Sequence, residues 1–333
     1  MLNRPRIRQL SLGELLDESF RLYRSNFLTF VAIAALVLVP YSLISFAVQY
    51  PFQAQIAELQ NQANSANFGG QSPFELIGEM IPWYVITIAV SLFYTVVFQP
   101  IMEGALAHSI AQRYLGREIG LGGSFGMALR HAPALIGARL IPVLIGTLFS
   151  GVLIGGSVLL ATLIIGGGSI NDLDTSSLGI LVLLSFLGFA VFGVVTLIGL
   201  ALMIRIMFTS QAVIVENAGA WQSLVRSWRL TQGSFWRILG YVLLMVLLIY
   251  VLAVLPVSVV SFIGGIIGLD QRILFVINAC AGAVLGVITT PFSMIAYTLL
   301  YFDLRVRKEG FDLEYQANAL LPNNMGMSAF ESR

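Results

Sequence analysis

The basic residues of this 333-residue chain are gathered in four clusters, and this distribution constrains the fold more than any other feature. Two long apolar stretches lie between each cluster and the next. Cytoplasmic loops of membrane proteins retain Lys and Arg, whereas translocated loops lose them. A chain that returns to a basic segment after every second apolar stretch therefore has both termini in the cytoplasm. The clusters are Arg4, Arg6, Arg8, Arg21 and Arg24; Arg113, Arg117, Arg130 and Arg139; Arg205, Arg226, Arg229 and Arg237; and Arg305, Arg307, Lys308 and Arg333, with only Arg272 outside them.

Each apolar stretch is long enough to cross a bilayer, which takes about 20 helical residues. Composition agrees, because 57% of the residues are hydrophobic and 11% are charged, whereas about 25% are charged in a soluble domain. We therefore expect an all-α polytopic membrane protein with six transmembrane helices. The stretches run from Phe27 to Gln49, Pro82 to Ala107, Leu140 to Gly168, Leu178 to Ile204, Ile238 to Gly268 and Ile273 to Phe302.

An internal similarity indicates three repeated units, each an amphipathic helix followed by a transmembrane hairpin. Ser19-Phe20-Arg21-Leu22 precedes the first stretch, and Ser227-Trp228-Arg229-Leu230 precedes the fifth at the matching place. The middle unit carries a fainter version of the pattern. We predict a single membrane domain, residues 1–333, with units at 10–107, 120–204 and 220–302, an outer loop at 50–81 and a cytoplasmic tail at 303–333. On this topology Leu121 and Ala220 are cytoplasmic, and Gln62 and Asn171 face outward.

The amphipathic helices predict a lipid interface on the cytoplasmic side. Ser11 and Glu14 form a capping-box pattern that starts the first helix. Aromatic rings suit headgroup depth, and arginines reach lipid phosphates from there. The alternative is that these helices pack against the hairpins as elbows and touch lipid only at their edges, and both placements can hold together. The third unit has its apolar stripe at Trp221, Leu224, Val225 and Trp228, and the predicted lipid-interface residues are Phe20, Arg21, Arg24, Trp221, Trp228 and Arg229.

Two terminal motifs resemble bacterial proteins of the glycerophosphoryl diester phosphodiesterase membrane-domain-like family. They are Leu10-Ser11-Leu12-Gly13-Glu14-Leu15-Leu16-Asp17 and Tyr301-Phe302-Asp303-Leu304-Arg305 with the residues that follow. The resemblance implies a membrane region in the bacterial cytoplasmic membrane. In related enzymes this region is fused to a separate catalytic barrel, and no segment between the apolar stretches has room for that barrel. We therefore expect no phosphodiesterase activity.

The sequence predicts no metal, cofactor or nucleic-acid site. It holds two His and one Cys, and its only lysine, Lys308, excludes a phosphate-binding loop of the Walker type. His108 and His131 are expected to be structural or solvated. We expect glycine pairs in the apolar stretches to allow close helix packing; these pairs are Gly151 with Gly155, Gly264 with Gly268, and Gly282 with Gly286.

Glu103 is the one acidic residue that falls clearly inside an apolar stretch. A charge there is costly unless it has a partner, so it marks either function or a structural ion pair. In the first interpretation Glu103 is a proton or cation site in a polar cavity; in the second it pairs with Arg139 or Arg205. The candidate intramembrane polar site consists of Gln99, Glu103, Arg139, Arg205 and Asn278.

The leading functional prediction is a non-enzymatic membrane protein that binds lipid or a protein partner through its cytoplasmic helices. Its expected lipid ligands are anionic headgroups, because the helices carry arginine. The first alternative is a small transporter with a polar cavity around Glu103. The second alternative is a membrane enzyme of lipid metabolism, for which no nucleophile and base can be assembled from spacing alone.

Overall fold

The computed structural model describes residues 8–64, 73–166 and 175–313, and these residues are helical apart from short connections. No strand occurs in these three ranges. The elements are α1 (Leu12–Ser25), α2 (Phe27–Asn64), α3 (Pro73–Phe93), η1 (Tyr94–Phe98), α4 (Gln99–Tyr114), α5 (Leu121–Arg130), α6 (Ala132–Gly166), α7 (Thr175–Ile206), α8 (Thr209–Glu216), α9 (Ala220–Thr231), α10 (Phe235–Ile249), η3 (Tyr250–Val254), α11 (Leu255–Ile266) and α12 (Gln271–Glu309).

Within the described chain, six helical segments are long and apolar enough to cross a membrane. This confirms the expected all-α class and the number of candidate spans. Three short helices, α1, α5 and α9, directly precede the candidate spans that begin with α2, α6 and α10. The candidate spans are Phe27–Gln53, Ile81–Tyr114, Ala132–Gly151, Phe186–Glu216, Phe235–Ile266 and Gln271–Glu309.

The helices extend farther than the sequence pattern predicts at several points. Most of the expected outer loop at 50–81 is helical, because α2 continues to Asn64 and α3 begins at Pro73. The expected tail from 303 onward begins inside α12, where Asp303, Leu304 and Val306 are buried. The charged residues there do not end the helix, because arginines of neighbouring helices form ion pairs with its carboxylates. Asn171, expected to face outward, lies outside the described residues.

Two prolines coincide with π-helical segments. Pro100 and Pro256 each occupy the second position of an α-helix that directly follows such a segment, η1 or η3. Proline lacks the N–H of the regular helical hydrogen bond and clashes with the preceding turn, so a local widening accommodates it. Pro40, Pro142 and Pro291 lie within continuous α-helices instead.

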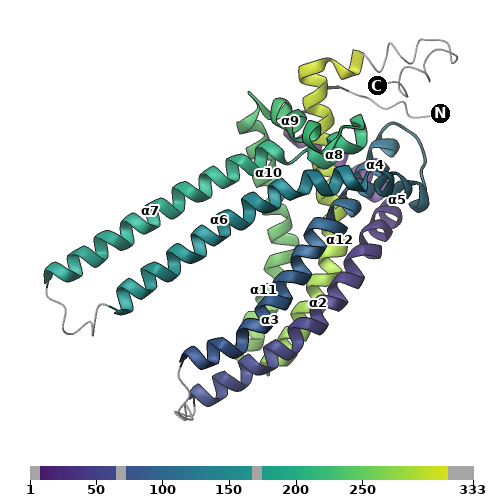
Figure 1. Cartoon of the computed structure of the whole chain (residues 1–333). Coiled ribbons are helices and arrows are strands. Elements are labelled where there is room, and N and C mark those ends of the chain that lie inside the picture. The colour runs from purple at the N-terminus through teal and green to yellow at the C-terminus, as the bar shows by residue number, and fades with distance from the viewer. Residues whose placement is uncertain (1–7, 65–72, 167–174, 314–333) are drawn as a thin grey trace.

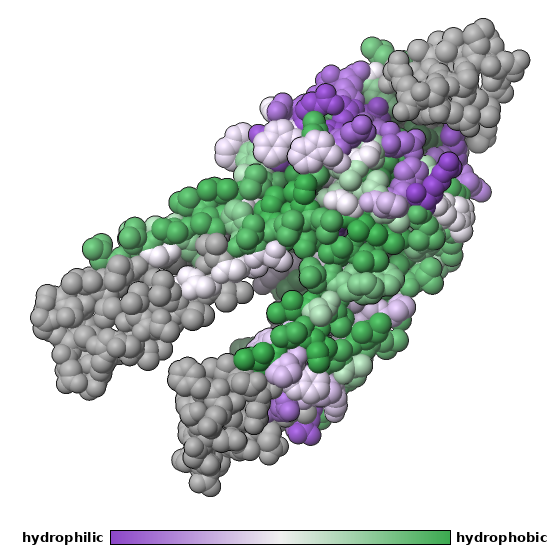
Figure 2. Space-filling view, in the orientation of Figure 1, coloured by the Kyte–Doolittle hydropathy of each residue, from purple (hydrophilic) through white to green (hydrophobic). Residues whose placement is uncertain are grey.

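The long helices form two arms that meet at one end of the molecule (Figure 1). One arm is the α6–α7 hairpin, and the other contains α2, α3, α10, α11 and α12. The largest buried side chains, among them Tyr241, Tyr301, Phe30 and Phe208, lie near the junction. Apolar side chains farther along the arms are exposed, as expected for surfaces that face lipid rather than a protein core. Figure 2 shows hydrophilic residues concentrated at the junction and a notch between the two arms.

The predicted close packing at glycine pairs is wrong for most of these glycines. An added Cβ would meet no described atom within 4 Å at Gly151, Gly155, Gly282 or Gly286. At Gly264 it would lie 2.4 Å from Cδ2 of Leu274, which marks a close approach. The spacing rule fails elsewhere because spacing does not say which side of a helix meets its neighbour, and the other glycines face away from the described side chains around them.

Candidate functional site

Part of the predicted polar cluster forms around Glu103 on α4. Gln99 donates from Nε2 to Glu103 Oε1 over 2.9 Å, and Ser210 donates from its hydroxyl to Oε2 over the same distance. Arg139 on α6 forms an ion pair with Glu103, with 3.2 Å between Nη2 and Oε1. The carboxylate therefore has three partners from α4, α6 and α8, as a charge removed from water requires.

Two predicted members of this cluster lie elsewhere. The Arg205 guanidinium lies over the Trp228 ring, 5.4 Å from its centroid, and Asn278 accepts a hydrogen bond from Ser261 over 2.8 Å. Of the two arginines proposed to pair with Glu103, the structure therefore brings Arg139 to it. Arg139 is reached because α6 begins at Ala132, so this residue lies two turns inside the helix rather than before it.

Ser210 is the partner that sequence reasoning missed. It belongs to α8, a short helix whose middle residues are buried, and it is separated from Glu103 by 107 positions. The only feature of the sequence that marks this position is a polar run, Thr209 to Gln211, directly after an apolar stretch. Such a run indicates a helix end, but it does not indicate the contact.

A groove of about 490 Å³ opens beside Arg139 where α6 diverges from α3. Its walls are one face of α3 and η1 and one face of α6, with a single residue from α7. Most of the lining is apolar, and hydroxyl groups supply the rest apart from Arg139. The lining residues are Thr87, Ile88, Ser91, Leu92, Thr95, Arg139, Pro142, Val143, Gly146, Thr147, Ser150 and Met203. The groove adjoins the notch between the arms in Figure 2.

The residues that line this groove are suited to binding an anionic ligand. Arg139 supplies a permanent positive charge with several N–H donors in one plane, which suits a phosphate or carboxylate. In the described ranges, no group of three or more His, Cys, Asp and Glu residues has an arrangement that suits a metal ion.

The α9 helix presents two different apolar surfaces. Ser223, Leu224 and Ser227 are buried against the rest of the protein, whereas Trp221 and Trp228 are 69% and 40% exposed. The predicted stripe is therefore divided, since Leu224 points inward and the tryptophans point outward. One side of α9 therefore packs against the rest of the protein while the other side is exposed at the surface.

A group of cations surrounds the end of α9. Arg205 lies under Trp228, and one of its nitrogens, Nη1, is buried without a hydrogen-bond partner. Lys308 donates to the backbone carbonyls of Gln232 and Arg229, which satisfies the end of the helix. The Arg229 side chain is exposed and makes no hydrogen bond or ion pair with the described residues. We call Arg205, Trp228, Arg229 and Lys308 the α9 patch.

The corresponding residues of α1 are arranged differently. Phe20 is 44% exposed and packs against Phe292, with 4.6 Å between ring centroids. Arg21 pairs with Glu18 of the same helix, and Arg24 is exposed. The helix start has the predicted capping box, in which the Ser11 hydroxyl accepts from the backbone of Glu14. Arg21 therefore has an acidic neighbour, which Arg229 lacks.

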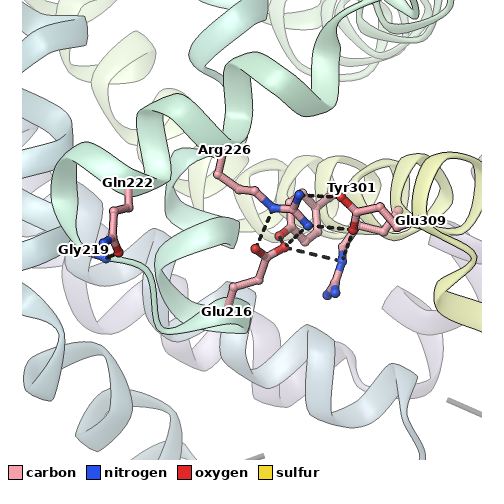
Figure 3. A network of polar contacts seen from close by, with 7 residues as sticks. Glu216, Gly219, Gln222, Arg226, Tyr301 and Glu309 are labelled. Atoms are coloured by element: carbon pink, nitrogen blue, oxygen red, sulfur yellow. Dashed lines mark hydrogen bonds and ion pairs between the residues drawn. The ribbon is translucent and has the colours of Figure 1, made fainter. Parts of the chain in front are cut away.

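An ion network holds α9 against α8 and α12, as Figure 3 shows. Arg226 donates from Nε to Glu216 over 2.6 Å and from Nη2 to Glu309 over 2.6 Å. Tyr301 donates its hydroxyl to Glu216, and Arg305 lies 3.2 Å from Glu309. Burial alone lowers the pKa of the Arg226 guanidinium, but its hydrogen bonds to Glu309 and Glu216 raise the pKa overall. The network fixes the orientation from which α9 presents its tryptophans.

We expect Arg226→Gln to reduce the free energy of unfolding by about 2–3 kcal/mol, because Glu216 and Glu309 would lose their shared cation. Arg229→Gln, on the same helix, is the matched control and should change it by less than about 0.5 kcal/mol. Denaturant unfolding in detergent would measure both variants. Equal effects of the two substitutions would contradict a structural role for this network.

Comparison with known proteins gives one family match. The family model described as "Domain of unknown function (DUF7847)" matches residues 124–301, which run from α5 into α12. No curated protein and no solved structure matches the chain. None of these comparisons ties the chain to the glycerophosphoryl diester phosphodiesterase membrane family, so that resemblance stays a prediction.

Proposed function

The chain belongs to the family of the domain of unknown function DUF7847, and from this premise we propose that it is a non-enzymatic multi-pass membrane protein that binds anionic lipid. The proposed binding surface is the α9 patch, at the cytoplasmic face of a bacterial inner membrane. The observation that carries the proposal is that the Arg205 guanidinium lies over the exposed ring of Trp228, while the next residue of α9, Arg229, is also exposed. Neither cation has an acidic partner among the described residues.

The physical basis is the preference of each group for the interface. Tryptophan is favoured where hydrocarbon meets headgroups, and arginine can hold a phosphate with two parallel hydrogen bonds. The buried face of α9 and the Arg226 network keep the helix in place, so binding requires little ordering of the protein. Trp236, at the start of α10, is 79% exposed and is another aromatic ring that can reach the interface.

The order of elements supports two further parts of the proposal. Each of α1, α5 and α9 precedes a pair of long helical segments, which favours three repeated units at 10–107, 120–204 and 220–302. The backbone N–H of Leu10 donates to Asp303, and Arg307 donates to the Leu10 carbonyl. The two described ends of the chain therefore meet near the other basic segments. We propose that this end is cytoplasmic, because positive charges are retained on that side.

Arg205→Gln combined with Arg229→Gln should weaken retention of anionic lipid roughly 25-fold, since each charge near an anionic surface contributes about 1 kcal/mol. Native mass spectrometry of the purified chain with added phosphatidylglycerol would measure the loss. Arg272→Gln is the control, because Arg272 is exposed at the opposite end of α12. Unchanged retention in a double variant that keeps its melting temperature would contradict the α9 patch as a lipid site.

A small transporter is the second candidate, and the cluster of Gln99, Glu103 and Ser210 beside the groove favours it. The mostly apolar lining of the groove favours an amphipathic ligand over a hydrophilic solute. We further propose that the resemblance to phosphodiesterase membrane regions concerns architecture alone. The purified chain should then hydrolyse no glycerophosphodiester.

A further inference from the structure

We infer that the groove between α3 and α6 is a second lipid site, which holds an anionic phospholipid with its phosphate at Arg139 and an acyl chain along the two helix faces. The inference rests on the proposed membrane placement but concerns a different surface from the α9 patch. It assigns Arg139 a ligand in addition to its ion pair with Glu103.

The walls of the groove suit a hydrocarbon chain. Ile88 and Leu92 lie one turn apart on α3, and Val143 faces the groove from α6. The hydroxyls of Thr147 and Ser150 are each bonded over 3.0 Å to a carbonyl of their own helix, so they require no polar ligand. Its volume of about 490 Å³ lies inside the range of about 300–1,000 Å³ that is usual for ligand sites.

The polar end of the groove suits a phosphate. Arginine has five N–H donors, and Nη2 of Arg139 makes the one hydrogen bond that the side chain has with the described residues. Its side chain is 23% exposed, and it lines the groove. The groove lies between the candidate spans Ile81–Tyr114 and Ala132–Gly151, so in the proposed membrane placement an anionic headgroup can enter it from the bilayer and take up the remaining donors.

Glu103 competes with a lipid phosphate for the Arg139 guanidinium. Gln99 donates to one oxygen of its carboxylate and Ser210 donates to the other, so the carboxylate is held in place. A lipid phosphate would therefore share Arg139 with a fixed competing anion. Removing the charge of Glu103 should strengthen binding, which is the opposite of what a purely structural ion pair predicts.

The test uses the full chain in phosphatidylcholine vesicles that contain a trace of phosphatidylglycerol with a photoreactive acyl chain. Cross-linked residues are mapped by peptide mass spectrometry, and photoreactive phosphatidylcholine serves as the zwitterionic comparison. We expect labelling of groove residues such as Ile88, Leu92 and Met203, with about a fivefold preference for the anionic lipid. Phosphatidylcholine carries the same phosphate, but its choline cation offsets the negative charge that Arg139 attracts. Equal labelling by both lipids would overturn the inference.

Four variants separate a specific site from bulk lipid contact. Glu103→Gln should increase groove labelling, and Glu103→Gln with Arg139→Gln, which leaves no unpaired charge, should abolish the anionic preference. Gly146→Phe should fill the groove and remove the labelling, since an added Cβ lies 3.7 Å from Met203 and is tolerated. Gly193→Phe on α7 is the matched control, because Gly193 lies outside the groove lining and an added Cβ meets nothing within 4 Å. Wild-type labelling in Gly146→Phe would refute the site.

The same assay keeps the two lipid proposals apart. Arg205→Gln with Arg229→Gln should leave groove labelling unchanged, even where it lowers lipid retention. If that double variant kept full lipid retention, the α9 patch would fail as a site while the groove result stood by itself. Loss of groove labelling in that variant would count against an independent groove.

Discussion

Asp303→Asn should reduce the free energy of unfolding by about 3–5 kcal/mol, because it would leave two arginines without their shared carboxylate. Asp303 is 2% exposed. Arg237 donates to it over 2.9 Å, and Arg307 donates over 2.9 and 3.1 Å. An Asn side chain is uncharged and can turn only one oxygen toward these donors. Denaturant unfolding in detergent would measure the change.

The same carboxylate also anchors the start of the chain. The backbone N–H of Leu10 donates to Asp303 over 2.8 Å, while Arg237 and Arg307 both donate to the Leu10 carbonyl. Limited proteolysis should therefore cut Asp303→Asn near its N-terminus faster than the wild type. Asp17→Asn, an exposed carboxylate on α1, is the control and should resemble the wild type. A loss of stability below about 1 kcal/mol for Asp303→Asn would show that the arginines find other partners.

The second prediction is an all-or-none difference in cysteine accessibility. In a Cys280→Ala background, Gln271→Cys should react with an impermeant maleimide on whole cells, and Leu121→Cys should react only after permeabilisation. Both positions are exposed, Gln271 at the start of α12 and Leu121 at the start of α5. The reason is that the basic segments near Leu121 are retained in the cytoplasm, whereas the α11–α12 connection has no basic residue and only Arg272 follows it, at the start of α12.

This experiment also tests the proposed orientation of the α9 patch, because α5 and α9 lie at the same end of the molecule (Figure 1). Reaction of Leu121→Cys on intact cells would place that end outside and would exclude cytoplasmic lipid as its ligand. Gln222→Cys, exposed on α9, gives an independent position with the same expected outcome as Leu121→Cys.

Sequence patterns were sufficient to predict which segments are helical, but they predicted less well where each helix ends. Long apolar runs between basic clusters predicted the number of candidate spans, since a bilayer fixes the length that a helix needs. The end of α12 depends on partners from other helices, and these were not visible in the pattern. The chain from Asp303 to Glu309 stays helical because arginines from α9, α10 and α12 itself neutralise its carboxylates.

By itself, the sequence determined the helical class, the candidate spans and the capping box at Ser11. Each of these follows from spacing within a few residues or from the cost of placing charge in hydrocarbon. Only the tertiary structure decided that Arg139 rather than Arg205 pairs with Glu103, and that Ser210 completes the cluster. It also created the groove, because the divergence of α6 from α3 depends on how the arms pack at their junction. Contacts between residues so far apart in the chain leave no periodic trace in the sequence.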